Sequence, residues 1–155
     1  MKKIFFLAAL LLLTFTAFAE TIPANDSRVT YVGRTLVEGT DVSFDWTATY
    51  FRLSFSGRSL TMRATDTKWD ATPEMAATRH NYYNVWIDAP MSAEPHRIIE
   101  VASADTIIEL IDPAYLKKSK IKEHQVIVQK RTEGEQGKMT IHEFATDAKG
   151  VFYQA

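Results

Sequence analysis

The side chains that could do chemistry in this sequence are first of all serines. A serine hydrolase needs its nucleophile on a tight turn, with a general base within hydrogen-bond reach. The nearest strings are Asn25-Asp26-Ser27, which lies in a lead-in segment, and Ser56-Gly57-Arg58-Ser59, which has the composition of an ordinary turn. A G-x-S-x-G nucleophile elbow is absent from the sequence. We therefore predict no catalytic residue in this chain.

Histidines and carboxylates give no metal-binding pattern either. The four histidines are His80, His96, His124 and His142. The pair His142-Glu143 begins a zincin-like pattern, but Thr146 stands where the second histidine would have to be. Asp66 and Asp70 could contribute oxygen ligands to calcium, although their spacing does not show that they converge. With no cysteine in the chain, disulfides and thiol nucleophiles are excluded, and we predict no metal site and no cofactor.

Aromatic side chains offer a different chemistry, because a flat exposed ring can bind a sugar. Trp86 falls on the strand face opposite Val85 and Ile87, and Trp69 lies in a loop-like stretch. Both are candidate carbohydrate contacts if they are exposed, and both would be packing residues if they are buried. We expect Trp46 in the core.

Alternating segments must position all of these residues. From Thr49 to Phe55, the side chains of Phe51, Leu53 and Phe55 share one face, as the period of two of a half-buried strand requires. The run from Ser59 to Thr65 alternates in the same way, and the short turn between the two runs predicts a β-hairpin.

Six further segments have strand character, namely residues 28–35, 82–88, 97–101, 106–111, 124–131 and 139–144. Residues 73–78 and 113–120 could be helical, but both are short, and we expect loops or a single turn there. About eight short strands separated by polar turns predict an all-β fold, an antiparallel β-sandwich of the jelly-roll type.

The N-terminus follows the pattern of a secretory signal. Lys2 and Lys3 precede an apolar run, and Ala17-Phe18-Ala19 forms a cleavage site. We predict a signal peptide over residues 1–19, a single domain over residues 20–155, and a secreted or periplasmic location without membrane attachment after cleavage. The formal net charge of −1 argues against nucleic acid as a partner, because such binding needs a concentrated basic face.

Three segments together, residues 43–60, 82–88 and 124–134 followed by Gly137, Phe144 and Gly150, resemble the N-terminal jelly-roll domain of carbohydrate esterase family 2. The resemblance extends over residues 27–152. It implies a C-terminal SGNH hydrolase domain, in the same polypeptide or missing, that supplies the nucleophilic serine and its histidine and deacetylates xylan or a related plant polysaccharide. This chain would then be the non-catalytic accessory domain of a carbohydrate esterase.

The most distinctive string in the resemblance is Lys130-Arg131-Thr132-Glu133-Gly134. Strand alternation predicts Lys130 and Thr132 on one face, with Arg131 and Glu133 on the other. Our hypothesis is that this run meets the hydrolase domain, with His124 as a further motif residue of the same segment; the alternative is a solvated hairpin arm. Two other functions remain open, a stand-alone carbohydrate-binding module that uses Trp69 and Trp86, and a structural or adhesive sandwich.

Overall fold

The computed structural model describes residues 19–67, 80–101 and 105–154, so residues 1–18 of the predicted signal peptide, Trp69 and Asp70 lie outside the described part. The strands in chain order are β1 (Thr21–Pro23), β2 (Thr30–Val32), β3 (Leu36–Glu38), β4 (Asp41–Phe44), β5 (Tyr50–Phe55), β6 (Leu60–Thr67), β7 (Asn81–Ile87), β8 (Arg97–Val101), β9 (Thr106–Glu109), β10 (His124–Lys130), β11 (Lys138–Thr146) and β12 (Phe152–Tyr153). A helix α2 (Pro113–Lys118) and a 3-10 turn η1 (Gly134–Gln136) complete the described elements.

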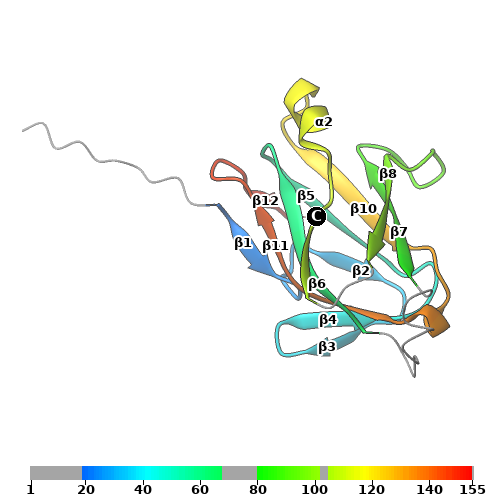
Figure 1. Cartoon of the computed structure of the whole chain (residues 1–155). Helices are drawn as coiled ribbons and strands as arrows, with labels where there is room; N and C mark the ends of the chain where they lie inside the picture. Colours follow the sequence, from blue (N-terminus) through cyan, green and yellow to red (C-terminus); the bar gives the residue numbers. More distant parts are fainter. Residues whose placement is uncertain (1–18, 68–79, 102–104, 155) are drawn as a thin grey trace, which may run out of the picture.

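Two six-stranded antiparallel sheets form a sandwich, as the sequence predicts (Figure 1). Sheet A has the order β3-β4-β11-β6-β9, with β1 also paired to β11. Sheet B has the order β12-β5-β10-β7-β8, with β2 also paired to β5. Helix α2 lies at one end of the sandwich and the β3–β4 hairpin at the other (Figure 1).

The core forms where the apolar faces of the alternating strands meet. Phe51, Leu53 and Phe55 on β5 are buried from one side, and Leu60, Met62 and Ala64 on β6 from the other. Across the interior, the rings of Phe51 and Phe144 lie 5.1 Å apart between centroids. The period of two therefore identified the inward residues of these strands correctly.

The predicted hairpin of β5 and β6 is wrong. Strand β5 pairs with β10, β2 and β12 in sheet B, whereas β6 pairs with β11 and β9 in sheet A. The connection is an arch that crosses between sheets, and Gly57 at φ 128° lets it pass where a Cβ would lie 2.6 Å from Asp147 Oδ1. Alternation says which side chains point inward, but an arch and a hairpin present the same alternation.

Short strands and a short helix make up the rest of the difference from the prediction. The sequence predicts about eight strands, and β1, β3, β4 and β12 were missed because each has only two to four residues. Helix α2 begins with Pro113 and is capped by Asp112, whose carboxylate accepts a hydrogen bond from the Ala114 amide at 2.8 Å. None of the described helices is long and apolar enough to cross a membrane.

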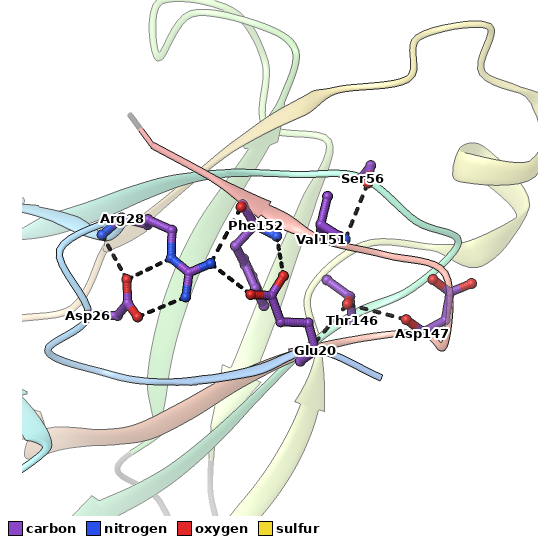
Figure 2. A network of polar contacts seen from close by, with 8 residues as sticks. All are labelled: Glu20, Asp26, Arg28, Ser56, Thr146, Asp147, Val151 and Phe152. Atoms are coloured by element: carbon purple, nitrogen blue, oxygen red, sulfur yellow. Dashed lines mark hydrogen bonds and ion pairs between the residues drawn. The ribbon is translucent and has the colours of Figure 1, made fainter. Parts of the chain in front are cut away.

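A network of ion pairs and hydrogen bonds links the two sheets where the segment before β1 lies beside β12 (Figure 2). Arg28 bonds to Asp26 at 2.8 Å and to Glu20 at 2.7 Å, and the other carboxylate oxygen of Glu20 accepts from the Phe152 amide at 2.7 Å. Burial raises the pKa of Glu20, but the hydrogen bonds from Arg28 and Phe152 outweigh it and leave the pKa lowered. For Asp26, the hydrogen bond from Arg28 is the main cause of a lowered pKa. The network ties the residue before β1 in sheet A to β12 in sheet B.

Candidate functional site

The distinctive run after β10 begins with a fully buried lysine. Lys130 has 0% of its surface exposed, and its ammonium donates hydrogen bonds to the carbonyls of Thr132 at 2.8 Å and Glu133 at 2.9 Å. It also donates to the Thr132 hydroxyl at 3.2 Å, so Lys130 and Thr132 share a side as predicted. Its position inside the domain, rather than at an exposed interface, makes Lys130 a support for the turn that follows.

Burial also changes the protonation of this lysine. It lowers the pKa of Lys130 to about 8, and the nearby carboxylates of Asp66, Asp45 and Glu133 oppose this effect only in part. On the far side of the turn, the Thr132 hydroxyl donates to Asn81 Oδ1 at 2.8 Å, and Asn81 Nδ2 donates to Asp66 Oδ1 at 2.7 Å. A chain of polar contacts therefore fixes the turn from within.

Arg131 and Glu133 lie on different surfaces of the domain, although strand alternation predicts that they share one face. The Arg131 side chain lines a hollow of about 490 Å³ on the outside of sheet B, together with Asn84 and Ile98. Glu133 instead accepts a hydrogen bond from the Thr47 hydroxyl at 2.9 Å and lines a hollow beside Trp46. Strand β10 ends at Lys130, so its alternation does not continue through residues 131–133.

Of the two alternatives for Trp86, the structure shows the packing residue, whereas Trp46 is exposed and not, as predicted, in the core. Trp86 is only 4% exposed, and its Nε1 donates to the Ala93 carbonyl at 2.8 Å, so the segment that follows β7 covers the ring. It is a packing residue in this structure and offers no open platform. Trp46, expected in the core, is 54% exposed. Trp69 lies outside the described residues.

Trp46 was misplaced because its strand is shorter than the pattern suggests. Val42 and Phe44 point inward, and continued alternation would bring Trp46 inward too. Strand β4 ends at Phe44, however, and Ala48 at φ 66° turns the chain toward β5. The small and polar residues after Trp46, Thr47 and Ala48, were the signal that the strand had already ended.

Two hollows adjoin the exposed indole, and we call them together the Trp46 site. One, of about 300 Å³, is lined by Arg34, Thr35, Leu36, Ser43, Phe44, Asp45, Trp46 and Lys138. The other, of about 620 Å³, is lined by Asp45, Trp46, Glu133, Gly134 and Glu135. The guanidinium of Arg34 lies 4.7 Å from the centre of the Trp46 ring, a cation–π contact that orients the indole. Asp45 and Trp46 line both hollows, so the two hollows are neighbours.

A hydroxyl, an imidazole and a carboxylate lie in line on the outer face of sheet A. Thr65 Oγ1 lies 2.8 Å from His142 Nε2, and His142 Nδ1 lies 3.0 Å from Asp41 Oδ2. In a neutral ring that carries its proton on Nδ1, the nitrogen nearer to the Asp41 carboxylate, Nε2 accepts from the Thr65 hydroxyl. Met139 and Ile141 point inward, so strand alternation places Thr140 and His142 on the outer side of β11. The register between β11 and β6 shifts between Ile141 and Glu143, so that His142 has no Cα partner on β6.

This arrangement resembles a nucleophile, base and orienting acid, but the nucleophile position is unsuitable. Thr65 lies within strand β6 and pairs with Thr140 of β11, whereas a hydrolase nucleophile stands on a tight turn beside donors for the oxyanion. Within the described ranges, no group of three or more His, Asp or Glu residues could hold a metal ion.

His124 belongs to the interior as well. It is 2% exposed and its Nδ1 lies 2.7 Å from Asp88 Oδ2, while the rings of Phe55 and Tyr115 pack against it. This packing joins β10 to α2 and leaves the imidazole out of reach of another domain. Of the predicted interface residues, Arg131, Thr132 and Glu133 are therefore the ones with any exposed surface.

Comparison with known proteins gives one family and one group of similar folds. The family model described as carbohydrate esterase 2 N-terminal matches residues 31–155. No curated protein matches the sequence.

The solved structures that match include carbohydrate esterases of greater length and one smaller domain. The family two carbohydrate esterase from Cellvibrio japonicus superposes with a TM-score of 0.65 at 19% identity, over 88% of this chain and 35% of that one. An acetyl xylan esterase from the rumen bacterium Butyrivibrio proteoclasticus gives 0.65 at 10% identity, over 89% and 34%. The CBM36-1 domain of a multidomain xylanase from the hindgut metagenome of Trinervitermes trinervoides gives 0.52 at 11% identity, over 88% and 98%. The chain thus spans about a third of the length of the esterases.

Proposed function

The chain belongs to the carbohydrate esterase 2 N-terminal family, and we propose that it is the non-catalytic accessory domain of a secreted carbohydrate esterase. The catalytic half would be a C-terminal SGNH hydrolase domain that removes acetyl groups from xylan or a related plant polysaccharide. The observation that carries the proposal is the match over residues 31–155 to a domain that occupies about a third of each esterase. The predicted signal peptide supports export.

The hydroxyl–imidazole–carboxylate arrangement at Thr65, His142 and Asp41 has its hydroxyl on a strand. We expect no hydrolysis of p-nitrophenyl acetate or acetylated xylan by the purified chain above the rate of the buffer. Turnover that disappears in Thr65→Ala would contradict the proposal, and turnover unchanged in that variant would identify a contaminant.

The hydrolase domain would dock on the outer face of sheet B. Tyr82 and Ile98 are exposed there beside Arg131, and aromatic residues and arginine are enriched where proteins meet. In the two-domain protein, Arg131→Glu should weaken docking, seen as separation of one thermal transition into two. Arg58→Glu, which reverses an exposed charge at the arch between the sheets, is the matched control. If Arg131→Glu and Arg58→Glu give the same thermal transitions, Arg131 does not lie in the interface.

A second function, glycan binding, is favoured by the exposed Trp46 with carboxylates around it. Carboxylates accept hydrogen bonds from sugar hydroxyls, and an exposed indole provides a flat apolar surface. The similar fold of the CBM36-1 domain agrees with this use of a sandwich but carries only the fold. Retardation of the chain in gels that contain xylan, lost in Trp46→Ala and kept in Tyr82→Ala, is the expected result. Equal retardation of wild type and Trp46→Ala would exclude the Trp46 site.

A further inference from the structure

The Trp46 site continues onto the outer face of sheet A. Ser43 lines the smaller hollow, is 3% exposed, and its hydroxyl lies 2.8 Å from the Thr140 hydroxyl on β11. Next to Thr140 along β11 and β6 come His142 and Thr65, with Asp41 at the start of β4. We call Ser43, Thr140, Thr65, His142 and Asp41 the polar array.

The polar array is held in place before any ligand arrives. Each of its members bonds to another member, at 2.8 Å for Ser43 to Thr140, 2.8 Å for Thr65 to His142 and 3.0 Å for His142 to Asp41. Preorganised polar groups lose little entropy when a ligand binds, which is the condition for affinity from a small contact area. From Asp41 to Phe44, β4 runs for about 10 Å at the usual rise per strand residue, and this is longer than one sugar ring.

Acidic side chains outnumber basic ones on this face and in the two hollows. Arg34, Arg63 and Lys138 stand against Asp41, Asp45, Asp105, Glu133, Glu135 and Glu143, and Arg63 is already paired with Asp105 at 2.5 Å. A nucleic acid or another polyanion would need a basic excess. A sugar hydroxyl both donates and accepts, and therefore matches a surface on which hydroxyls, an imidazole and carboxylates alternate.

We propose that an uncharged glycan chain binds lengthwise across this face, from the carboxylate-lined hollow over Trp46 and along the polar array to His142. The proposal rests on the second function above for the choice of a glycan, and adds the direction of the chain and the residues beyond Trp46. We call this path the glycan track, or the track. Exposed residues on the edge strands border it on both sides, Leu36 on β3 and Ile107 on β9.

Affinity as a function of chain length tests the proposal. We expect xylohexaose or cellohexaose to bind the full chain about tenfold more tightly than the matching disaccharide, since the longer ligand adds hydrogen bonds worth about that factor. His142→Ala and the conservative Asp41→Asn should weaken hexaose binding about three- to tenfold and leave disaccharide binding unchanged. Trp46→Ala should weaken both ligands, and Tyr82→Ala, on the other sheet, should weaken neither. Isothermal titration calorimetry gives each affinity, and urea unfolding confirms that each variant is folded.

The outcomes separate this inference from the functions on which it rests. Equal affinity for disaccharide and hexaose, or hexaose binding untouched by both His142→Ala and Asp41→Asn, overturns the track, even where Trp46→Ala still abolishes binding and glycan binding at Trp46 stands. Absence of binding to either hexaose overturns the track together with the glycan-binding function, and leaves the accessory role as it was. A loss in Tyr82→Ala equal to that in His142→Ala also overturns the track, because the effect would not then belong to sheet A.

Discussion

The outer face of sheet A carries hydroxyls, an imidazole and a carboxylate that bond to one another, whereas the outer face of sheet B carries Tyr82 and Ile98 beside a covered tryptophan. Both sheets bury their inward faces in the same way, so the difference is made outside the core. On sheet A the outward residues of β11 meet polar partners on the neighbouring strands β4 and β6. On sheet B the Ala93 carbonyl accepts a hydrogen bond from Trp86, and the segment after β7 covers the ring. Strand patterning determines the inside of the sandwich, whereas strand neighbours and loops determine what its outer faces can bind.

The two tryptophans give the largest expected contrast between the faces. Truncation of a buried tryptophan costs about 3–5 kcal/mol because a cavity remains, so Trp86→Ala should lower the free energy of unfolding by about that amount. Trp46→Ala removes an exposed ring and its contact with Arg34, worth about 1 kcal/mol or less. Urea unfolding of both variants measures the difference. Similar losses in both would show that the loop after β7 does not cover Trp86 in solution.

The ion network at Arg28 links the two sheets, and its removal measures how much this link stabilises the domain. Arg28→Ala should lower the free energy of unfolding by about 2 kcal/mol, since charge-assisted hydrogen bonds to Glu20 and Asp26 are lost. Both carboxyl pKa values are lowered in the folded protein, so this contribution is present above the usual carboxyl pKa and is lost as the pH falls through the lowered values. The difference in the free energy of unfolding between wild type and Arg28→Ala should therefore become smaller in acid.

Arg52→Ala, which removes an exposed arginine on β5, is the control for that experiment and should change stability by less than about 0.5 kcal/mol. A gap between wild type and Arg28→Ala that stays constant down to low pH would mean that Arg28 contributes by packing alone.

Lys130 holds the turn that separates the faces, and its replacement has a smaller expected effect. Lys130→Met removes three hydrogen bonds to the turn but also relieves the burial of a charge, and we expect a net loss of about 1–2 kcal/mol at neutral pH. With the folded pKa lowered from 10.5 to about 8, the unfolded chain binds the proton more tightly than the folded one. Wild-type stability should therefore rise between about pH 8 and 10.5, whereas the variant lacks this rise. A variant more stable than wild type at pH 10 would contradict the role of Lys130.

Much of the sandwich could be predicted from the sequence, because successive residues of a strand point alternately to its buried and its exposed face. Phe51, Leu53 and Phe55 were assigned to one face by pattern alone, and all three are buried. The pairing of β5 with β10 rather than β6 could not be read, since it depends on whether a turn stays in its sheet or crosses to the other.

The candidate site was predictable only in part, for a related reason. The run from Lys130 to Glu133 was singled out in the sequence, but its alternation stops with the strand, and Glu133 lines the hollow beside Trp46. His142 lies on the outer side of β11, as alternation from Met139 and Ile141 requires. Its partners come from β4 and β6, and a single sequence does not show which strands lie next to β11.

The contact between Glu20 and Phe152 bears on the order in which the domain can fold. The carboxylate that accepts from the Phe152 amide belongs to the start of the described chain, and its partner belongs to the last strand, 132 residues later. Because contacts between distant residues form slowly and only after the intervening loops close, a growing polypeptide cannot complete this closure until residue 152 has been synthesised. The contact at Glu20 therefore forms only after β12 has been made, and a ribosome-bound chain that ends short of β12 would lack both this contact and one edge of sheet B.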